Sequence, residues 1–396
     1  MLLRFELKKL LSRRFLKAFV FLLLFINAFN IYQNYDVFIT PEKGLSSGEY
    51  VSFASFRYAM DKDYEGPVTQ EKADRLNAHI RRAAEAYKTG NLPWEEGYFR
   101  LPGGDKLAGE ALLEEMERLY NYNKNVVEPM LKKNSEMASS GSAYSKRICS
   151  MIDRIYSGRS ISEYYRVNEY RPLLSYKLSS LFLMLLAIYA AAGLFAGERE
   201  SHMYALQKST ALGSSHIFFT KLVALALFAL ILGLLFYAED LLMFTLCRRP
   251  SGLHLPLWAI NDAISDYTFS PVNLSVGGFV ALLWAVRSLG IFATAMIGVV
   301  FSLLLKRSFG AFLASLPCIA GLMTLTMFTD GVLSAVRYFN PVTLLIYPRL
   351  CESFLLQNVL GIPVQAHVLA PICCSFLLVV LMASSFLLYK RRNAND

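Results

Sequence analysis

The sequence predicts an all-α polytopic membrane protein with six transmembrane helices, an amino-terminal interfacial helix and a mostly helical extracytoplasmic domain between the first two spans. Of the 396 residues, 55% are hydrophobic and only 18% are charged, whereas soluble domains carry about 25% charged residues. The apolar residues are concentrated in runs of roughly 17 to 25 residues, the length that a helix needs to cross the hydrocarbon core. Basic residues flank these runs, which indicates a lipid bilayer as partner and not a nucleic acid.

Residues 1–14 predict a cytoplasmic interfacial helix. In the stretch MLLRFELKKLLSRR, Leu3, Leu7 and Leu10 share one helical face and the basic side chains lie opposite. Residues 15–32 predict the first transmembrane helix. A cleaved signal peptide is the alternative for this region, but no small-x-small cleavage site follows the apolar run. A retained span is therefore favoured.

Residues 33–172 form a polar insertion that is long enough for a domain. Helical patterns over 70–88, 106–137 and 143–157 predict that this extracytoplasmic domain is mostly helical. The alternative is a partly disordered loop, because the insertion is highly charged, although its acidic and basic residues nearly balance.

Residues 173–396 predict a five-helix transmembrane domain with a cytoplasmic loop at 196–215. The five spans are expected at 173–195, 216–237, 288–305, 309–328 and 367–389, with external segments at 247–273 and 329–365. Each span is an apolar run bounded by charged or turn-forming residues.

Basic residues in short loops predict the orientation of the spans. They cluster at the amino end, at Lys306 and Arg307 between spans four and five, and after span six at Lys390–Arg392. Six spans place all three clusters on one side of the membrane, which is then cytoplasmic. The pair Arg248–Arg249 is the exception, because it falls on the external side. The sequence therefore predicts a multi-pass protein of the cell membrane with both ends cytoplasmic and residues 33–172 extracytoplasmic.

The sequence contains no motif of a catalytic or metal-binding protein. It has no GxxxxGK[ST] phosphate-binding loop, no HExxH, no CxxC and no paired carboxylates suited to catalysis within a span. We therefore expect no catalytic residues, no metal site and no directly bound cofactor. Free thiols are expected for the six cysteines, and a disulfide among Cys149, Cys247 and Cys351 stays open.

The loop after the second span reads FAGERESHMYALQKSTALGSSHIFFTKL, from Phe195 to Leu222. A small-residue turn and an acidic pair are followed by a short helical stretch with a Leu and a Ser-Thr, a Gly-containing turn and a Lys. This order resembles the permeases of type-2 ATP-binding-cassette (ABC) transporters. The matching positions are Gly197, Glu198, Glu200, Leu206, Ser209, Thr210, Gly213 and Lys221. His202 and Met203 stand where many members have Gly-Thr, and a plain solvated loop is the alternative reading.

The overall plan of the chain also resembles that family: an amphipathic amino-terminal helix, one span, a large external insertion and five more spans. The resemblance implies a bacterial exporter in which this chain forms half of the translocation path, as a homodimer or with a related second permease. ATP would be bound and hydrolysed by a separate ABC ATPase subunit. The residues implied in coupling to that subunit are Glu198, Glu200, Leu206, Ser209, Thr210 and Gly213.

Three further ionisable residues are expected near the outer ends of spans three and four. Glu239 and Asp240 lie just past residue 237, at the outer end of span three, and Arg287 lies at the outer end of span four. Ionisable groups at membrane depth are costly unless they are paired or hydrated. Three hypotheses stay open: an intramembrane polar pairing by a salt bridge across spans three and four, a polar rim on the translocation path, and simple contact of all three residues with headgroup water.

Two other functions stay open. A membrane-anchored sensor or interaction protein would use the external helical domain to bind a ligand, and a polytopic lipid-modifying enzyme would need clustered polar groups near one membrane face. The transported substrate and the choice between homodimer and heterodimer are not determined by the sequence.

Overall fold

The computed structural model describes residues 2–12, 14–35, 38–39, 51–52, 61–89, 108–201, 214–261, 267–327 and 333–395. These residues are mostly helical, and the sheets among them are three two-stranded pairs. Six of the described helices are long and apolar enough to cross a membrane. The predicted class, an all-α polytopic membrane protein with six transmembrane helices, is therefore confirmed.

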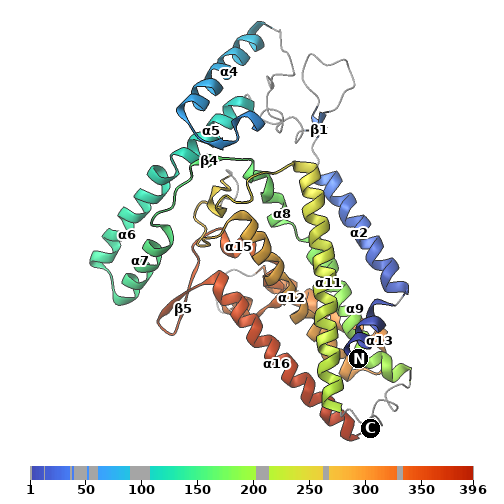
Figure 1. Ribbon diagram of the computed structural model, residues 1–396. Coiled ribbons are helices and arrows are strands. Elements are labelled where there is room, and N and C mark those ends of the chain that lie inside the picture. The colour runs from blue at the N-terminus through green and yellow to red at the C-terminus, as the bar shows by residue number, and fades with distance from the viewer. Residues whose placement is uncertain are drawn as a thin grey trace.

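The six long apolar helices form one bundle. They are α2 (Arg14–Tyr35), α9 (Leu178–Glu200), α11 (Ser214–Arg248), α12 (Val276–Leu304), α13 (Ser308–Leu325) and α16 (Ala366–Asn395). Helices α2, α9 and α11 pack against one another, and α12 packs against α9, α11, α13 and α16. The N- and C-terminal ends lie at the same end of the bundle (Figure 1). A helix satisfies its backbone polar groups internally, which hydrocarbon requires.

The fourth span begins earlier than predicted. Helix α12 starts at Val276, and the hydroxyl of Ser275 before it accepts a hydrogen bond from the Gly278 amide at 3.2 Å. This is the geometry of an N-cap. The predicted start at residue 288 is wrong, because Arg287 lies inside the helix with its side chain buried and does not mark the end of the span.

Two glycines of α12 allow close packing in the bundle. A Cβ at Gly298 would lie 3.1 Å from the Ala191 Cβ of α9, and a Cβ at Gly290 would lie 2.8 Å from the Pro341 carbonyl oxygen. Small residues let helix backbones approach each other closely inside a membrane. The packing of α12 against α9 therefore depends on small side chains.

The polar insertion is mostly helical where the structure describes it. Its helices are α4 (Gln70–Thr89), α5 (Ala108–Tyr120), α6 (Glu128–Ser140) and α7 (Ala143–Tyr156). A π-helix, η3 (Asn123–Val127), connects α5 to α6 where one continuous helix over 106–137 is predicted. The other short elements are β1 (Phe38–Ile39), β2 (Val51–Ser52), η1 (Lys62–Tyr64), β3 (Gly66–Pro67), β4 (Glu163–Tyr164), η4 (Val167–Tyr170) and α8 (Arg171–Ser175).

The insertion packs onto the loop between α11 and α12, which also contains η5 (Leu257–Ala259). The Tyr122 hydroxyl donates to the Thr268 carbonyl at 3.0 Å, and the Tyr156 hydroxyl donates to the Phe269 carbonyl at 2.7 Å. The Arg159 guanidinium lies over the rings of Tyr156 and Trp258, at 4.3 and 4.2 Å. Burial raises the pKa of Tyr156 to about 12, so this phenol stays a neutral donor at physiological pH.

The segment before the last span is not a simple loop. It contains α14 (Leu333–Phe339), η6 (Pro341–Ile346), α15 (Pro348–Cys351) and the hairpin of β5 (Leu356–Val359) with β6 (Ile362–Gln365). Helix η6 is buried against α12, because its residues Pro341 to Leu345 are inaccessible and Pro341 reaches Gly290 near the middle of that span. Part of the predicted external segment 329–365 therefore belongs to the packed bundle.

Candidate functional site

Three helices meet around one carboxylate at the end of the bundle that carries both chain termini. Glu198, in the last turn of α9, is only 2% exposed. Its Oε1 accepts a hydrogen bond from Lys9 Nζ of α1 (Leu2–Leu11) at 2.6 Å, and its Oε2 accepts one from Lys221 Nζ of α11. We call this arrangement of Glu198, Lys9 and Lys221 the Glu198 junction. It connects the amino-terminal helix to the second and third spans.

The charges of the Glu198 junction are compensated, and those of Glu198 and Lys221 are buried, whereas the side chain of Lys9 is 33% exposed. Lys221 is 1% exposed, and its ammonium lies 4.9 Å from the centre of the Phe195 ring. A second acid, Glu6 of α1, is also buried, and its Oε2 lies 4.0 Å from Lys9 Nζ. Buried charges in proteins are usually paired, because the desolvation free energy of an unpaired buried charge is not offset by any attraction. Two acids and two bases therefore form one compact neutral group.

The next two residues of α9 contact two further spans. The Arg199 guanidinium donates to two carbonyls at the carboxyl end of α12, those of Ser302 and Leu303. The distance from Arg199 Nη1 to the Leu303 oxygen is 3.2 Å. The Glu200 carboxylate accepts from the hydroxyl of Ser308 at 2.7 Å and from its amide at 3.3 Å, at the start of α13. A cation at a helix carboxyl end and an anion at a helix amino end both interact favourably with the helix dipole. The consecutive residues 198–200 of α9 thus contact four other helices, α1, α11, α12 and α13.

The predicted coupling residues have different structural settings. Glu198 is buried in the junction, whereas Glu200 is exposed and caps α13. The predicted positions Leu206, Ser209, Thr210 and Gly213 lie outside the described residues.

Sequence reasoning missed the roles of Lys9, Glu6 and Arg199. A signal for Glu6 was present, because it is the single acid in the basic stretch 1–14 and lies one helical turn before Lys9.

A second polar cluster lies within the bundle, between α2, α9 and α11. The Asn27 side chain donates to Asp240 at 2.8 Å and to Glu239 at 3.2 Å. The Ser179 hydroxyl donates to Asp240 at 2.6 Å, and the Tyr176 hydroxyl donates to Asn27 Oδ1 at 2.8 Å. Polar side chains between membrane helices commonly bond to one another in this way. Asn27 of the first span is the partner that sequence reasoning did not identify.

Arg287 donates to a backbone carbonyl and not to these acids. Its guanidinium donates to the Leu174 carbonyl at 2.9 Å, and it lies 6.0 Å from the centre of the Tyr237 ring. Among the described residues, no ion pair joins Arg287 to Glu239 or Asp240. The predicted pairing across spans three and four is therefore wrong for Arg287, because Asn27 and Ser179 supply the donors to the acids. Nor does Arg287 reach headgroup water, since it is buried.

A family model described as ABC-2 family transporter protein matches residues 118–383. The matched stretch includes the last two helices of the insertion, spans two to five and most of the sixth span. No curated protein and no solved structure matches the chain. Because the family model covers more than half of the chain, whose described residues include six potential membrane-spanning helices, the chain belongs to the ABC-2 transporter permease family.

Proposed function

We propose that this permease is the membrane subunit of an ATP-driven exporter and that it couples to a separate ATPase chain through α1 and the adjoining loop. The observation that carries the proposal is the Glu198 junction, in which the buried carboxylate of Glu198 joins Lys9 of α1 to the ends of α9 and α11. The permease would form half of the translocation path, with a second copy or a related permease as the other half. ATP would be bound by the partner ATPase and not by this chain.

The junction is built to transmit a displacement. Through Glu198 a push on α1 reaches α9 and α11, and through Arg199 and Glu200 it reaches α12 and α13. Packed side chains and paired charges move together, because separating a buried ion pair is costly. A displacement at this end of the bundle is therefore shared by four of the six spans.

Helix α1 also has a face for a partner. Leu10 and Glu6 are buried against the bundle, while Arg4, Phe5 and Lys8 are exposed on the other side. A short helix with an exposed mixed face suits a groove on another protein. The resemblance also implies contacts through Leu206, Ser209, Thr210 and Gly213, which follow α9 in the chain.

The proposed orientation places both chain ends in the cytoplasm and residues 33–172 outside the cell membrane of a bacterium. It is supported by the basic residues at the amino end, between spans four and five and after span six. An ATPase supplied with cytoplasmic ATP would then meet α1 directly.

Affinity purification of the tagged permease in mild detergent, with and without a non-hydrolysable ATP analogue, tests the coupling. We expect a stoichiometric ATPase with a phosphate-binding loop to copurify with the native chain. The double variant Arg4→Glu/Lys8→Glu should lose this partner, because both residues are exposed on α1 and serve no packing role. The matched control is Arg391→Glu, an exposed basic residue at the other chain terminus.

Glu198→Lys is unsuitable for this test, because the buried junction would be disrupted together with any interface. Recovery of the permease without an ATPase in several detergents would contradict the proposal and favour the membrane-anchored sensor. Equal loss of the ATPase in Arg4→Glu/Lys8→Glu and Arg391→Glu would show that α1 is not the specific contact.

A further inference from the structure

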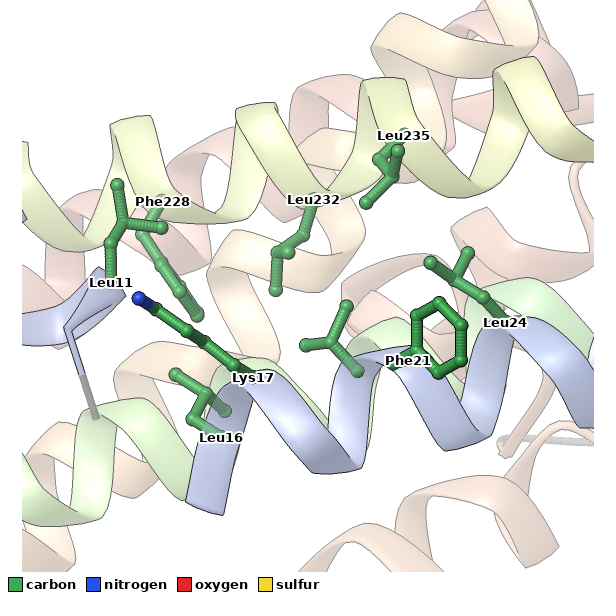
Figure 2. Close-up of a pocket in the computed structure, with 9 residues that line it drawn as sticks. Leu11, Leu16, Lys17, Phe21, Leu24, Phe228, Leu232 and Leu235 are labelled. Atoms are coloured by element: carbon green, nitrogen blue, oxygen red, sulfur yellow. The ribbon is translucent and has the colours of Figure 1, made fainter. Parts of the chain in front are cut away.

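An apolar groove lies between the first and third spans, beside the end of α1. It has a volume of about 260 Å³ and lies between Leu16, Val20 and Leu24 of α2 and Phe228, Leu232 and Leu235 of α11. Figure 2 shows these two helices facing each other across the groove. An apolar cavity of this kind is not filled by water, because water needs polar partners. Any occupant of the groove is therefore expected to be apolar.

The groove has one charged lining residue, Lys17. Its ammonium group points to the end of the groove where Leu11 and Phe228 lie (Figure 2). Lys17 is the second residue of the first membrane-spanning segment and is exposed. A long basic side chain at the end of a membrane helix places its charge at the level of the lipid headgroups. The groove thus has an apolar body and a cationic end at the membrane surface.

The groove is open to the surface that hydrocarbon covers. Phe21 and Leu235 on its rim are 75% and 45% exposed, and Phe25 on the next turn of α2 is 65% exposed. In a membrane-spanning helix, such side chains contact lipid chains. An acyl chain can therefore enter the groove from the bilayer without leaving hydrocarbon.

We propose that this groove binds one acyl chain of an anionic phospholipid, from the leaflet on the α1 side, and that Lys17 binds the phosphate of its headgroup. The combination of an apolar body and a single cationic end matches an anionic lipid in both shape and charge. The occupant is a resident lipid and not the transported substrate. The proposal rests on the membrane-spanning helices and does not depend on an ATPase partner.

Charge favours a lipid over a second copy of the chain. The mouth of the groove adjoins α1, which carries Arg4 and Lys8 as exposed basic side chains. A second copy would bring the same basic helix to a basic mouth, whereas anionic headgroups are attracted to such a cluster. A bound lipid would also contact both α1 and α2, because Leu11 at the end of α1 and Leu16 in the first turn of α2 both line the groove.

Native mass spectrometry of the purified permease tests the proposal. The protein is released from nanodiscs that contain equal amounts of phosphatidylglycerol and phosphatidylcholine with identical chains. We expect the native chain to retain one phosphatidylglycerol, and Lys17→Gln to lower its retention about fivefold relative to phosphatidylcholine. Lys17→Arg should restore the preference, because it keeps the charge.

Two further variants separate the parts of the site. Lys306→Gln is the matched control, because Lys306 is an exposed lysine between α12 and α13 that does not line the groove, and it should retain the lipid as the native chain does. Val20→Phe narrows the apolar body and should reduce retention of both lipids, with thermal unfolding confirming that the variant is folded.

Three outcomes would overturn the proposal: equal retention of the two lipids by the native chain, the same loss in Lys306→Gln as in Lys17→Gln, or efficient disulfide cross-linking of two copies through Phe21→Cys. The last result would assign the groove to a second copy. None of these measurements involves the ATPase, so the failure of this proposal is distinguishable from failure of the coupling proposal.

Discussion

Lys221 of α11 and Glu198 of α9 form an ion pair in which both side chains are almost completely inaccessible, at 1% and 2% exposure. Lys9 of α1 completes the arrangement from the other carboxylate oxygen at 2.6 Å. Lys9 thereby attaches the amino-terminal helix to the bundle through the buried carboxylate of Glu198. The stability of the whole junction should depend on Glu198 more than on any exposed residue nearby.

Replacement of Glu198 by glutamine should destabilise the folded protein strongly. The variant leaves the ammonium of Lys221 buried without its anion, a change that typically costs about 3–5 kcal/mol. Thermal unfolding in detergent, followed with a thiol-reactive dye, measures the effect, because five of the six cysteines are buried and become reactive on unfolding. Glu200→Gln is the control, since its exposed side chain keeps an oxygen that can accept from Ser308.

The double variant Glu198→Gln/Lys221→Met should recover part of the lost stability, because it removes the orphaned charge. A Glu198→Gln variant as stable as Glu200→Gln would show that the junction is not a buried ion pair in the membrane.

Replacement of Asn27 by leucine should weaken the packing of the first span. Asn27 donates to Asp240 and Glu239 and accepts from Tyr176, so the variant removes the hydrogen bonds that link α2 to α9 and α11. Each hydrogen bond between membrane helices contributes about 0.6 kcal/mol on average and up to about 1.7 kcal/mol. We expect a loss of roughly 1–3 kcal/mol, measured by thermal unfolding in detergent.

The matched control for Asn27 is Asn34→Leu. Asn34 is an exposed residue of the same helix whose side chain bonds only to the carbonyl of Asn30 among its described contacts. A loss of stability as large in Asn34→Leu as in Asn27→Leu would mean that the polar cluster contributes nothing specific.

Replacement of Gly290 by alanine should also destabilise the protein. The added Cβ would lie 2.8 Å from the Pro341 carbonyl oxygen and 3.0 Å from the Leu344 Cβ, so η6 must move away from α12. Overpacking of this kind costs about 1–3 kcal/mol. Gly321→Ala is the control, because nothing lies within 4 Å of its added Cβ, and its unfolding temperature should equal or exceed that of the native chain. A neutral Gly290→Ala would argue against the tight contact between η6 and α12.

Single cysteines should reveal the orientation of the chain. In a Cys318→Ser background, which removes the exposed native thiol, Lys146→Cys on α7 should react with a membrane-impermeant maleimide in intact cells. Lys390→Cys near the end of α16 should react only after the cells are permeabilised. Both lysines are exposed, so burial does not limit either reaction. The reverse labelling pattern would invert the proposed topology.

The sequence by itself determined the class of the protein and the number of its spans. Hydrocarbon requires that the backbone polar groups bond to one another, and a run of about 20 apolar residues meets this requirement as a helix that spans the membrane. Periodicity likewise located α4 and α7 in the insertion, close to the predicted 70–88 and 143–157. Local patterns failed where one charged residue was decisive: the prediction begins the fourth span at residue 288, just after Arg287, whereas α12 begins at Val276 and buries Arg287 within it.

Only the tertiary structure decided which polar residues are buried and what they bind. Glu198 and Glu200 look equivalent in the sequence, but residues two apart point to different sides of a helix, and one is buried in the junction while the other caps α13. The partners Asn27 and Asp240 are 213 positions apart, and Lys9 and Glu198 are 189 apart. Such contacts arise from the packing of whole helices, and no pattern within one helix specifies them.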